Sequence, residues 1–445
     1  MTAPVDVAEL SFQEVDAFPP LASIGHGELF ALRLSNNTAT RTHGLHRFPA
    51  KFVPQVPAWA LRELGGPGTV ALDPFMGSGT TLVEGAVRGG TTIGVDVDPF
   101  ARLLAGAKVT AVPAVRMEQL AAELLDRWRA PAAVLRVPLP GVVRFDHWFR
   151  PGQWAWLQSL HDQIMGLGCT DAERRFLLVV FSSVLRRVSN ADDQTQKTYV
   201  SGTLRKDPPP VPATFRRVLA RALDGLAELE RDRHPDAVAR IPAGGDARRL
   251  ECGPVDLIVT SPPYLDSVDY PYNMMLEYFW LGPHLGVEDR RALNLLRRRP
   301  MGAKQPLAPE PLPAVLDGLT RLDVLPPARR PAAASYFALM AGHFAEAARV
   351  LRPGGRYVLV VGNSASRSDV LPVHQALVAL AAGAGLHLET GFGYRVRRHS
   401  MRFPRAGRGG IILLDWVLVL RRSDGGGPAV PEVPWVTLAP GAVAH

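Results

Sequence analysis

Val70-Ala-Leu-Asp73-Pro-Phe-Met-Gly77-Ser-Gly79-Thr-Thr81 decides the fold, because a short apolar strand passes directly into a glycine turn. The residues after the turn predict a helix over 80–88, and Thr92-Ile-Gly-Val-Asp96 predicts a second strand. Strand, turn, helix and strand within about 30 residues form a βαβ unit, which requires a parallel sheet with a right-handed crossover. Further strands are expected at 255–259, 357–361, 387–396 and 411–420, so the chain is predicted to be an α/β protein.

The glycine turn does not have the spacing of a phosphate-binding loop. A dinucleotide fingerprint needs a third glycine where this chain has Leu82, and a P-loop needs a Gly-Lys pair that is absent. Asp73 at the strand end would repel phosphate but attract an amino group. Asp96, 23 residues later, is placed to accept hydrogen bonds from ribose hydroxyls.

S-adenosylmethionine has the matching groups, namely an ammonium, a ribose and an adenine without phosphate. A third acid, Asp246 in Gly245-Asp-Ala247, precedes the strand at 255–259 and could accept from the adenine amino group. The alternative is that all three aspartates are only loop or cap residues.

Thr260-Ser-Pro-Pro-Tyr264 follows the strand at 255–259, so it lies at the edge of the sheet where open α/β folds bind ligands. Two prolines stiffen the loop and leave carbonyls as its polar groups. The Ser261 hydroxyl and the Pro262 carbonyl could accept both hydrogens of an aromatic amine and aim its lone pair at a sulfonium methyl group. Tyr264 could stack on a base taken out of a helix. The alternative is a structural Pro-Pro turn with an incidental tyrosine.

Together, the Asp73–Thr81 and Thr260–Tyr264 motifs resemble those of the bacterial exocyclic-amino DNA methyltransferases. The resemblance covers about 43–110, 241–282 and 335–420. It implies a Rossmann-like sheet that binds S-adenosylmethionine, a flipped base, and catalytic roles for Ser261, Pro262, Pro263 and Tyr264. The cofactor residues that it implies are Asp73, Pro74, Phe75, Gly77, Ser78, Gly79, Thr80, Asp96, Asp246 and Ala247. His46-Arg-Phe-Pro-Ala-Lys-Phe52 is similar to the element that encloses the methionine part in this family.

The first residue of the catalytic loop bears on which base is modified. Within the family, Ser preceded by Thr is typical of cytosine-N4 enzymes, and Asp or Asn is typical of adenine-N6 enzymes, so we favour cytosine N4 with adenine N6 as the alternative. Cytosine-C5 chemistry needs a thiolate, and neither Cys169 nor Cys252 follows a proline as that family's nucleophile does. A structured-RNA guanine-N2 methyltransferase and a catalytically silent DNA-binding protein remain further alternatives.

The basic residues favour an acidic partner, and the resemblance implies that this partner is double-stranded DNA. The alternative is that a genome rich in G and C raises the arginine content. The chain has a net charge of +8, and 45 of its 50 basic residues are arginine, which suits phosphate and guanine. Residues 1–109 sum to −2 and 241–280 to −4, whereas 110–240 and 281–330 each carry +4. Six further charges fall in one predicted loop between strands, which we expect to contact DNA phosphates: Arg395, Arg397, Arg398, Arg402, Arg405 and Arg408.

The sequence also bears on metal binding, on where the protein is located and on how the chain is divided into segments. No metal-ligand constellation is present, the first 14 residues lack a basic residue, and no apolar run approaches the roughly 20 residues of a membrane span. We therefore expect a cytoplasmic, nucleoid-associated enzyme, with a cognate restriction endonuclease as a possible partner. The expected segments are an N-terminal arm (1–42), the cofactor-loop part of the catalytic domain (43–109), a helical insertion (110–240), the catalytic-loop segment (241–282), an Arg/Pro-rich target-recognition segment (283–334), the rest of the catalytic domain (335–422) and a flexible tail (423–445).

Overall fold

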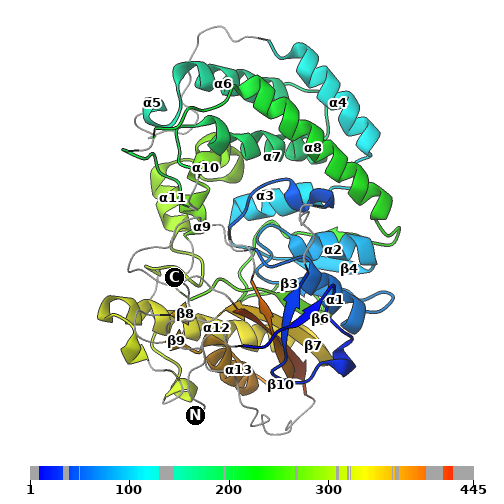
Figure 1. Cartoon of the computed structure of the whole chain (residues 1–445), viewed down its shortest axis with the longest axis vertical. Coiled ribbons are helices and arrows are strands. Elements are labelled where there is room, and N and C mark those ends of the chain that lie inside the picture. The colour runs from blue at the N-terminus through cyan, green and yellow to red at the C-terminus, as the bar shows by residue number, and fades with distance from the viewer. Residues whose placement is uncertain are drawn as a thin grey trace.

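The structure is a computed structural model, and a large mixed sheet forms the lower half of the molecule with a group of helices above it (Figure 1). It describes residues 10–33, 40–49, 51–129, 145–193, 197–203, 205–265, 269–306, 310–317, 320, 322–362, 364–365, 370–396 and 414–423. The nine strands lie in the order β1 (Gln13–Val15), β2 (Leu29–Leu32), β10 (Leu386–Arg395), β11 (Leu414–Arg422), β7 (Leu351–Gly362), β6 (Val255–Thr260), β3 (Val70–Asp73), β4 (Thr91–Gly94) and β5 (Val238–Arg240).

The order in which successive strands are added to the sheet reverses at the boundary between β3 and β6, which we call the reversal point. From β3 the chain moves outward to β4 and β5, and it then returns to the other side of β3 as β6 and continues to β7. These five strands are parallel, and β11 runs antiparallel between β7 and β10. Such a doubly wound sheet binds ligands outside the carboxyl ends of the strands that flank the reversal. The predicted α/β, Rossmann-like fold is confirmed.

Helices cover both faces of the sheet, which explains its continuous apolar runs. Along β7, Tyr357, Leu359 and Val361 join a core with α12 (Arg330–Val350) and α13 (Val373–Gly383). The alternate residues Val358 and Val360 join a second core with α1 (Gln55–Leu64) and the N-terminal segment. Side chains alternate between faces along a strand, so a strand buried on both sides is apolar throughout.

The remaining helices bring the inserted segment against the catalytic domain. The core of the insertion includes α3 and α10, and Trp280 of α10 packs on Trp154 of α6 with ring centroids 4.5 Å apart. The insertion is therefore not a detached domain. The α-helices whose bounds have not yet been given are α2 (Thr80–Arg88), α3 (Pro99–Lys108), α4 (Ala114–Arg127), α5 (Phe145–Trp148), α6 (Pro151–Met165), α7 (Asp171–Val188), α8 (Val211–Asp232), α9 (Tyr270–Asn273), α10 (Met275–Leu281) and α11 (Arg290–Leu296).

Two expected boundaries differ from the structure. Residues 238–240, which the sequence placed in the helical insertion, form β5 at the edge of the main sheet. The N-terminal arm, in which no strand was expected, contributes β1 and β2 to the opposite edge. Both cases involve strands of three or four residues, too short to show periodicity. None of the described helices is both long and apolar enough to cross a membrane.

Candidate active site

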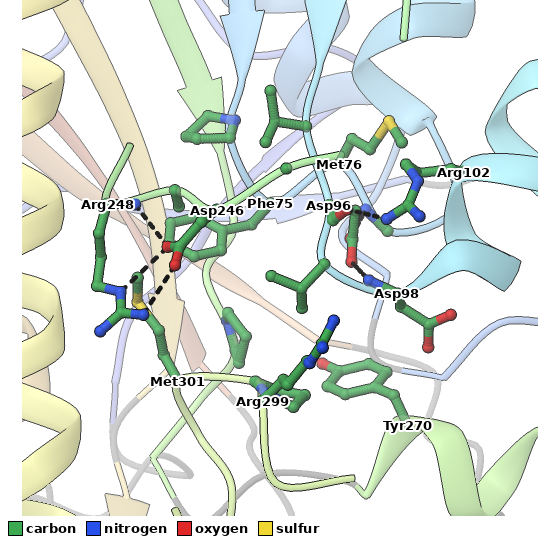
Figure 2. A pocket seen from close by; sticks show the side chains of 18 of the residues that line it. Phe75, Met76, Asp96, Asp98, Arg102, Asp246, Arg248, Tyr270, Arg299 and Met301 are labelled. Atoms are coloured by element: carbon green, nitrogen blue, oxygen red, sulfur yellow. Dashed lines mark hydrogen bonds and ion pairs between the residues drawn. The ribbon is translucent and has the colours of Figure 1, made fainter. Parts of the chain in front are cut away.

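A cavity of about 770 Å³ opens at the reversal point of the sheet (Figure 2). Its walls come from the loops that follow β3, β4 and β6, together with the segment that precedes β6. The structure thus brings together most of the residues expected to bind cofactor. Pro74, Phe75, Gly77, Ser78, Thr80, Asp96, Asp246, Ala247, Ser261 and Pro263 line it, whereas Asp73, Gly79, Pro262 and Tyr264 do not.

The glycine loop can form only with glycine at two positions. Gly77 has φ +47° and Gly79 has φ +76°, a region that side chains rarely adopt. A Cβ on Gly79 would lie 2.8 Å from the Cβ of Ala105, so this glycine allows α2 to pack on α3. Ser78 beside it is buried, and its hydroxyl has no hydrogen-bond partner in the described part of the chain. A buried polar atom at a cavity wall is suited to a ligand.

Asp73 connects the glycine loop to the strand that carries Ser261. Thr260 donates to its Oδ1 and Thr81 to its Oδ2, both at 2.6 Å, and the Phe75 amide donates to Oδ1 at 3.2 Å. The side chain is fully buried, and burial raises the pKa of Asp73 to about 6. The carboxylate expected at the methionine end is therefore committed to neighbouring protein groups.

Asp96 faces the cavity from the end of β4. Its Oδ2 accepts from the Gly77 amide at 2.9 Å, and its Oδ1 accepts from the Asp98 amide at 2.8 Å. Burial, together with the charge of Asp98, raises the pKa of Asp96 to about 7. The carboxylate is thus fixed in orientation beside the glycine loop, where a ribose could donate to its remaining lone pairs.

Asp246 lies across the cavity and is held by a neighbouring arginine. Arg248 donates to both of its oxygens, at 2.7 and 3.1 Å, as the dashed lines in Figure 2 indicate. Burial alone would raise the pKa of Asp246, but the hydrogen bonds and charge of Arg248 together lower it. The next carbonyl, of Ala247, is 2.8 Å from Nδ1 of the buried His343, whose ring also packs against Phe75. These contacts fix the expected adenine end.

The catalytic loop is anchored through its last residue. The Tyr264 hydroxyl donates to Oδ1 of Asp415 in β11 at 3.0 Å, and Tyr394 donates to the other oxygen at the same distance. Burial raises the pKa of Asp415 to about 6, and burial together with Asp415 raises the pKa of Tyr264. The tyrosine is therefore a neutral anchor that holds the loop against the sheet, with Ser261 left at the cavity wall.

Three parts of the cavity were not identified from the sequence. Asp98 caps α3 and leaves Oδ2 without a partner in the described part of the chain, and the Asp-Pro pair at a helix start could have indicated this cap. Tyr270 stacks on Phe48 of the upstream element, with centroids 5.7 Å apart. Residues 298–301 close a further side. No local pattern indicates the last two contacts, because both join distant segments.

The expected DNA-contact loop falls mostly outside the described residues. Arg395 ends β10, and its guanidinium lies 5.6 Å from the centre of the Phe12 ring. Arg397, Arg398, Arg402, Arg405 and Arg408 lie outside the described residues, as does the expected tail from 424 onward. Within the described ranges, no three histidine, cysteine or acidic side chains gather as a metal site would require.

Comparison with known proteins gives two similar sequences of known name. The chain is 28% identical over 292 residues to the Type II methyltransferase M.MvaI of Kocuria varians, a match that spans 61% of this chain and 64% of that protein. It is 33% identical over 98 residues to the Type II methyltransferase M.MjaII of Methanocaldococcus jannaschii, spanning 22% of this chain and 18% of the other. The chain thus matches less than two thirds of either relative.

Solved structures resemble the chain more distantly. TrmN from Thermus thermophilus is 14% identical, with a TM-score of 0.29 over 83% of this chain and 49% of that one. The rRNA methyltransferase aviRa from Streptomyces viridochromogenes is 13% identical, with a TM-score of 0.32 over 88% of this chain and 94% of that one. No protein-family model matches the chain.

Proposed function

We propose that the chain is an S-adenosylmethionine-dependent DNA methyltransferase that modifies the exocyclic N4 amine of a flipped-out cytosine. One observation carries the proposal: a single cavity brings the glycine loop, Asp96, Asp246 and Ser261 together at the reversal point of the sheet. The similarity to two proteins named Type II methyltransferases supports it.

The residues of the cavity fit S-adenosylmethionine. Asp96 would accept from the ribose hydroxyls, and Asp246 with Ala247 would hold the adenine end. The unpartnered Ser78 hydroxyl and the close approach at Gly77 would hold the methionine end. When bound, the cofactor supplies a methyl group on a positively charged sulfur.

The catalytic loop would orient the amine that receives the methyl group. Ser261 lies on the cavity wall, Pro262 next to it is buried, and Tyr264 holds the end of the loop to Asp415. The Ser261 hydroxyl and the Pro262 carbonyl would accept the two amine hydrogens and direct the nitrogen lone pair toward the cofactor. No strong base is needed at this position, because the nitrogen releases a proton only after methylation has made it positively charged.

Tyr264 would have two roles in this proposal. Its hydroxyl positions the loop through Asp415, and its ring would stack on the extruded base. The choice of cytosine over adenine rests on Ser261, since Ser preceded by Thr is typical of the cytosine-N4 enzymes that this loop resembles. A cognate restriction endonuclease that acts on the same site is the partner we propose for such an enzyme.

Methyl transfer from labelled S-adenosylmethionine to duplex DNA and to structured RNA tests the activity. We expect label in DNA only. Tyr264→Phe keeps the ring but loses the hydroxyl that holds the loop to Asp415, so its turnover measures the contribution of the anchor. Tyr264→Ala loses the ring as well and should turn over at least about tenfold more slowly than Tyr264→Phe, since base stacking contributes roughly 1–3 kcal/mol. Label in RNA alone would contradict the proposed substrate, and equal turnover of the two variants would remove the ring from the mechanism.

A further inference from the structure

Residues 298–301 form one wall of the cavity, and hydrogen bonds hold the segment around them in place. They belong to the Arg/Pro-rich segment 283–334, which the family resemblance does not cover. Arg297 donates to Oδ2 of Asp269 at 2.7 and 2.8 Å and lies 5.0 Å from the centre of the Tyr272 ring. Arg298 donates to the carbonyls of Gln305 and Pro306, both at 3.2 Å. The backbone at Arg299, between these anchors and buried Met301, is therefore fixed.

This wall runs from one end of the cavity to the other. Figure 2 shows Met301 beside the Asp246–Arg248 pair, and it shows the Arg299 side chain extending into the cavity beside Tyr270. Tyr270 stacks on Phe48, and a Cβ on Gly77 would lie 3.1 Å from the Phe48 ring. Arg299 is thus on the Gly77 side, where the proposed function puts the methionine part of the cofactor.

Arg299 differs from the other cations that line the cavity in having no protein partner among the described residues. Lys51 donates to the His43 carbonyl, Arg102 to the Asp96 carbonyl, and Arg298 to the two carbonyls named above. Arg248 pairs with Asp246, and Arg249 pairs with Glu251 at 3.2 Å. An exposed guanidinium at a cavity wall without a protein acceptor is suited to an anionic group of the ligand, which it can bind through two hydrogen bonds.

We infer that Arg299 binds the α-carboxylate of the methionine part of S-adenosylmethionine, so that residues outside the catalytic core complete the cofactor site. The inference rests on the proposed function and deepens it. The carboxylate is the cofactor's only anionic group. The phosphate of a DNA strand that enters the same cavity is the competing anion, and the experiment below separates the two.

Ligand binding to Arg299→Gln, measured by calorimetry, tests the inference without depending on turnover. The probes are S-adenosylmethionine and decarboxylated S-adenosylmethionine, which differ only in the carboxylate. We expect Arg299→Gln to weaken the first roughly ten- to hundredfold and to leave the second unchanged, because only the first offers the charged acceptor. Arg299→Lys should recover part of the loss. Arg291→Gln removes another exposed charge from the same segment, away from the cavity, and should change neither.

The other possible results would overturn either this inference or the proposed function. Equal loss of both ligands, or no loss of either, overturns the inference, and weakened binding of DNA alone assigns Arg299 to a phosphate instead. Because the side chain is exposed and has no described protein partner, Arg299→Gln should melt at the wild-type temperature. Failure of the wild-type chain to bind S-adenosylmethionine would contradict the proposed function itself.

Discussion

At the scale of single residues, the environment of Asp73 shows how the site is held together. Its buried carboxylate accepts from Thr81 at the start of α2 and from Thr260 at the end of β6. One side chain therefore links the glycine loop to the residue that precedes Ser261. From the sequence we expected Asp73 to attract the ammonium of the cofactor; in the structure it does not line the cavity, and its oxygens accept hydrogen bonds from both loops.

Thr260→Val tests this positioning role. The change keeps the shape of the side chain but leaves a buried carboxylate oxygen without its 2.6 Å donor, which should cost about 1–3 kcal/mol of the free energy of unfolding. Turnover should fall as well, because the link between the loops is lost. Thr110→Val removes another buried threonine bond, to the Gly106 carbonyl at 3.1 Å, and serves as the control. A turnover no lower than that of the control would count against the positioning role.

The raised pKa of Asp96 predicts a pH dependence of cofactor binding. Its carboxylate accepts from ribose only when ionised, and its pKa is about 7 because of burial and the charge of Asp98. Protonation below that value removes an acceptor, so affinity for S-adenosylmethionine should fall as the pH drops from 8 to 6, by at most about tenfold per pH unit. Titration calorimetry across this range measures the slope.

Asp96→Asn is the control for that slope, since it cannot ionise. The variant should bind the cofactor weakly at every pH, with only the shallower dependence that arises from the cofactor's own amino group. The same slope in wild type and Asp96→Asn would show that another group is responsible.

At the scale of elements, the long strands and helices followed from periodicity. The expected helix at 80–88 and strand at 70–73 coincide with α2 and β3, and the expected helical insertion at 110–240 contains α4 to α8. Short elements were missed because three residues carry no periodic signal. In the site, the glycine loop and the catalytic loop could be predicted because each directly follows a strand, whereas Tyr270 and Arg299 could not, since tertiary packing alone brings them there.

The insertion carries a cluster of arginines suited to DNA phosphates. Arg187 at the end of α7 and Arg217 and Arg221 on α8 are exposed, and they form no side-chain hydrogen bond or ion pair with a described residue. Burial and the charges of Arg217 and Arg221 lower the pKa of Arg187, so the three guanidinium groups lie close enough to repel one another.

This cluster is connected to the cavity through the loop that follows α7. Thr198 in that loop donates to the Asn273 carbonyl at 2.8 Å, and Arg47 donates to the same oxygen at 2.9 Å. Asn273 ends α9, whose first residue, Tyr270, lines the cavity. The basic end of the insertion is thus joined to the element beside the catalytic loop.

Replacing Arg187, Arg217 and Arg221 together with glutamine should weaken DNA binding and reduce its salt dependence. Each lost phosphate contact should lower the slope of log K against log salt by about 0.9. Fluorescence anisotropy with a labelled duplex at several salt concentrations measures the slope. The same substitution at Arg88, Arg127 and Arg240 removes equal charge elsewhere. A slope that falls equally in both triple variants would contradict a specific DNA-binding role for the cluster.

At the scale of the whole molecule, the acidic and the basic segments of the chain occupy different parts of the fold. The segments that build the cavity, 1–109 and 241–280, are acidic, and the insertion and residues 281–330 are basic. The cavity at the reversal point of the sheet lies between these parts, because α9 contacts the insertion and residues 298–301 form one wall. A polyanion held by the basic segments would therefore meet the catalytic loop, as a DNA methyltransferase requires.

Identification of the methylated nucleoside tests the central claim most directly. Duplex DNA is incubated with the chain and S-adenosylmethionine, digested to nucleosides and analysed by mass spectrometry, with Ser261→Ala as the parallel variant. We predict N4-methylcytosine with the wild-type chain and a large decrease with the variant. N6-methyladenine as the product, or no methylated nucleoside at all, would contradict the claim.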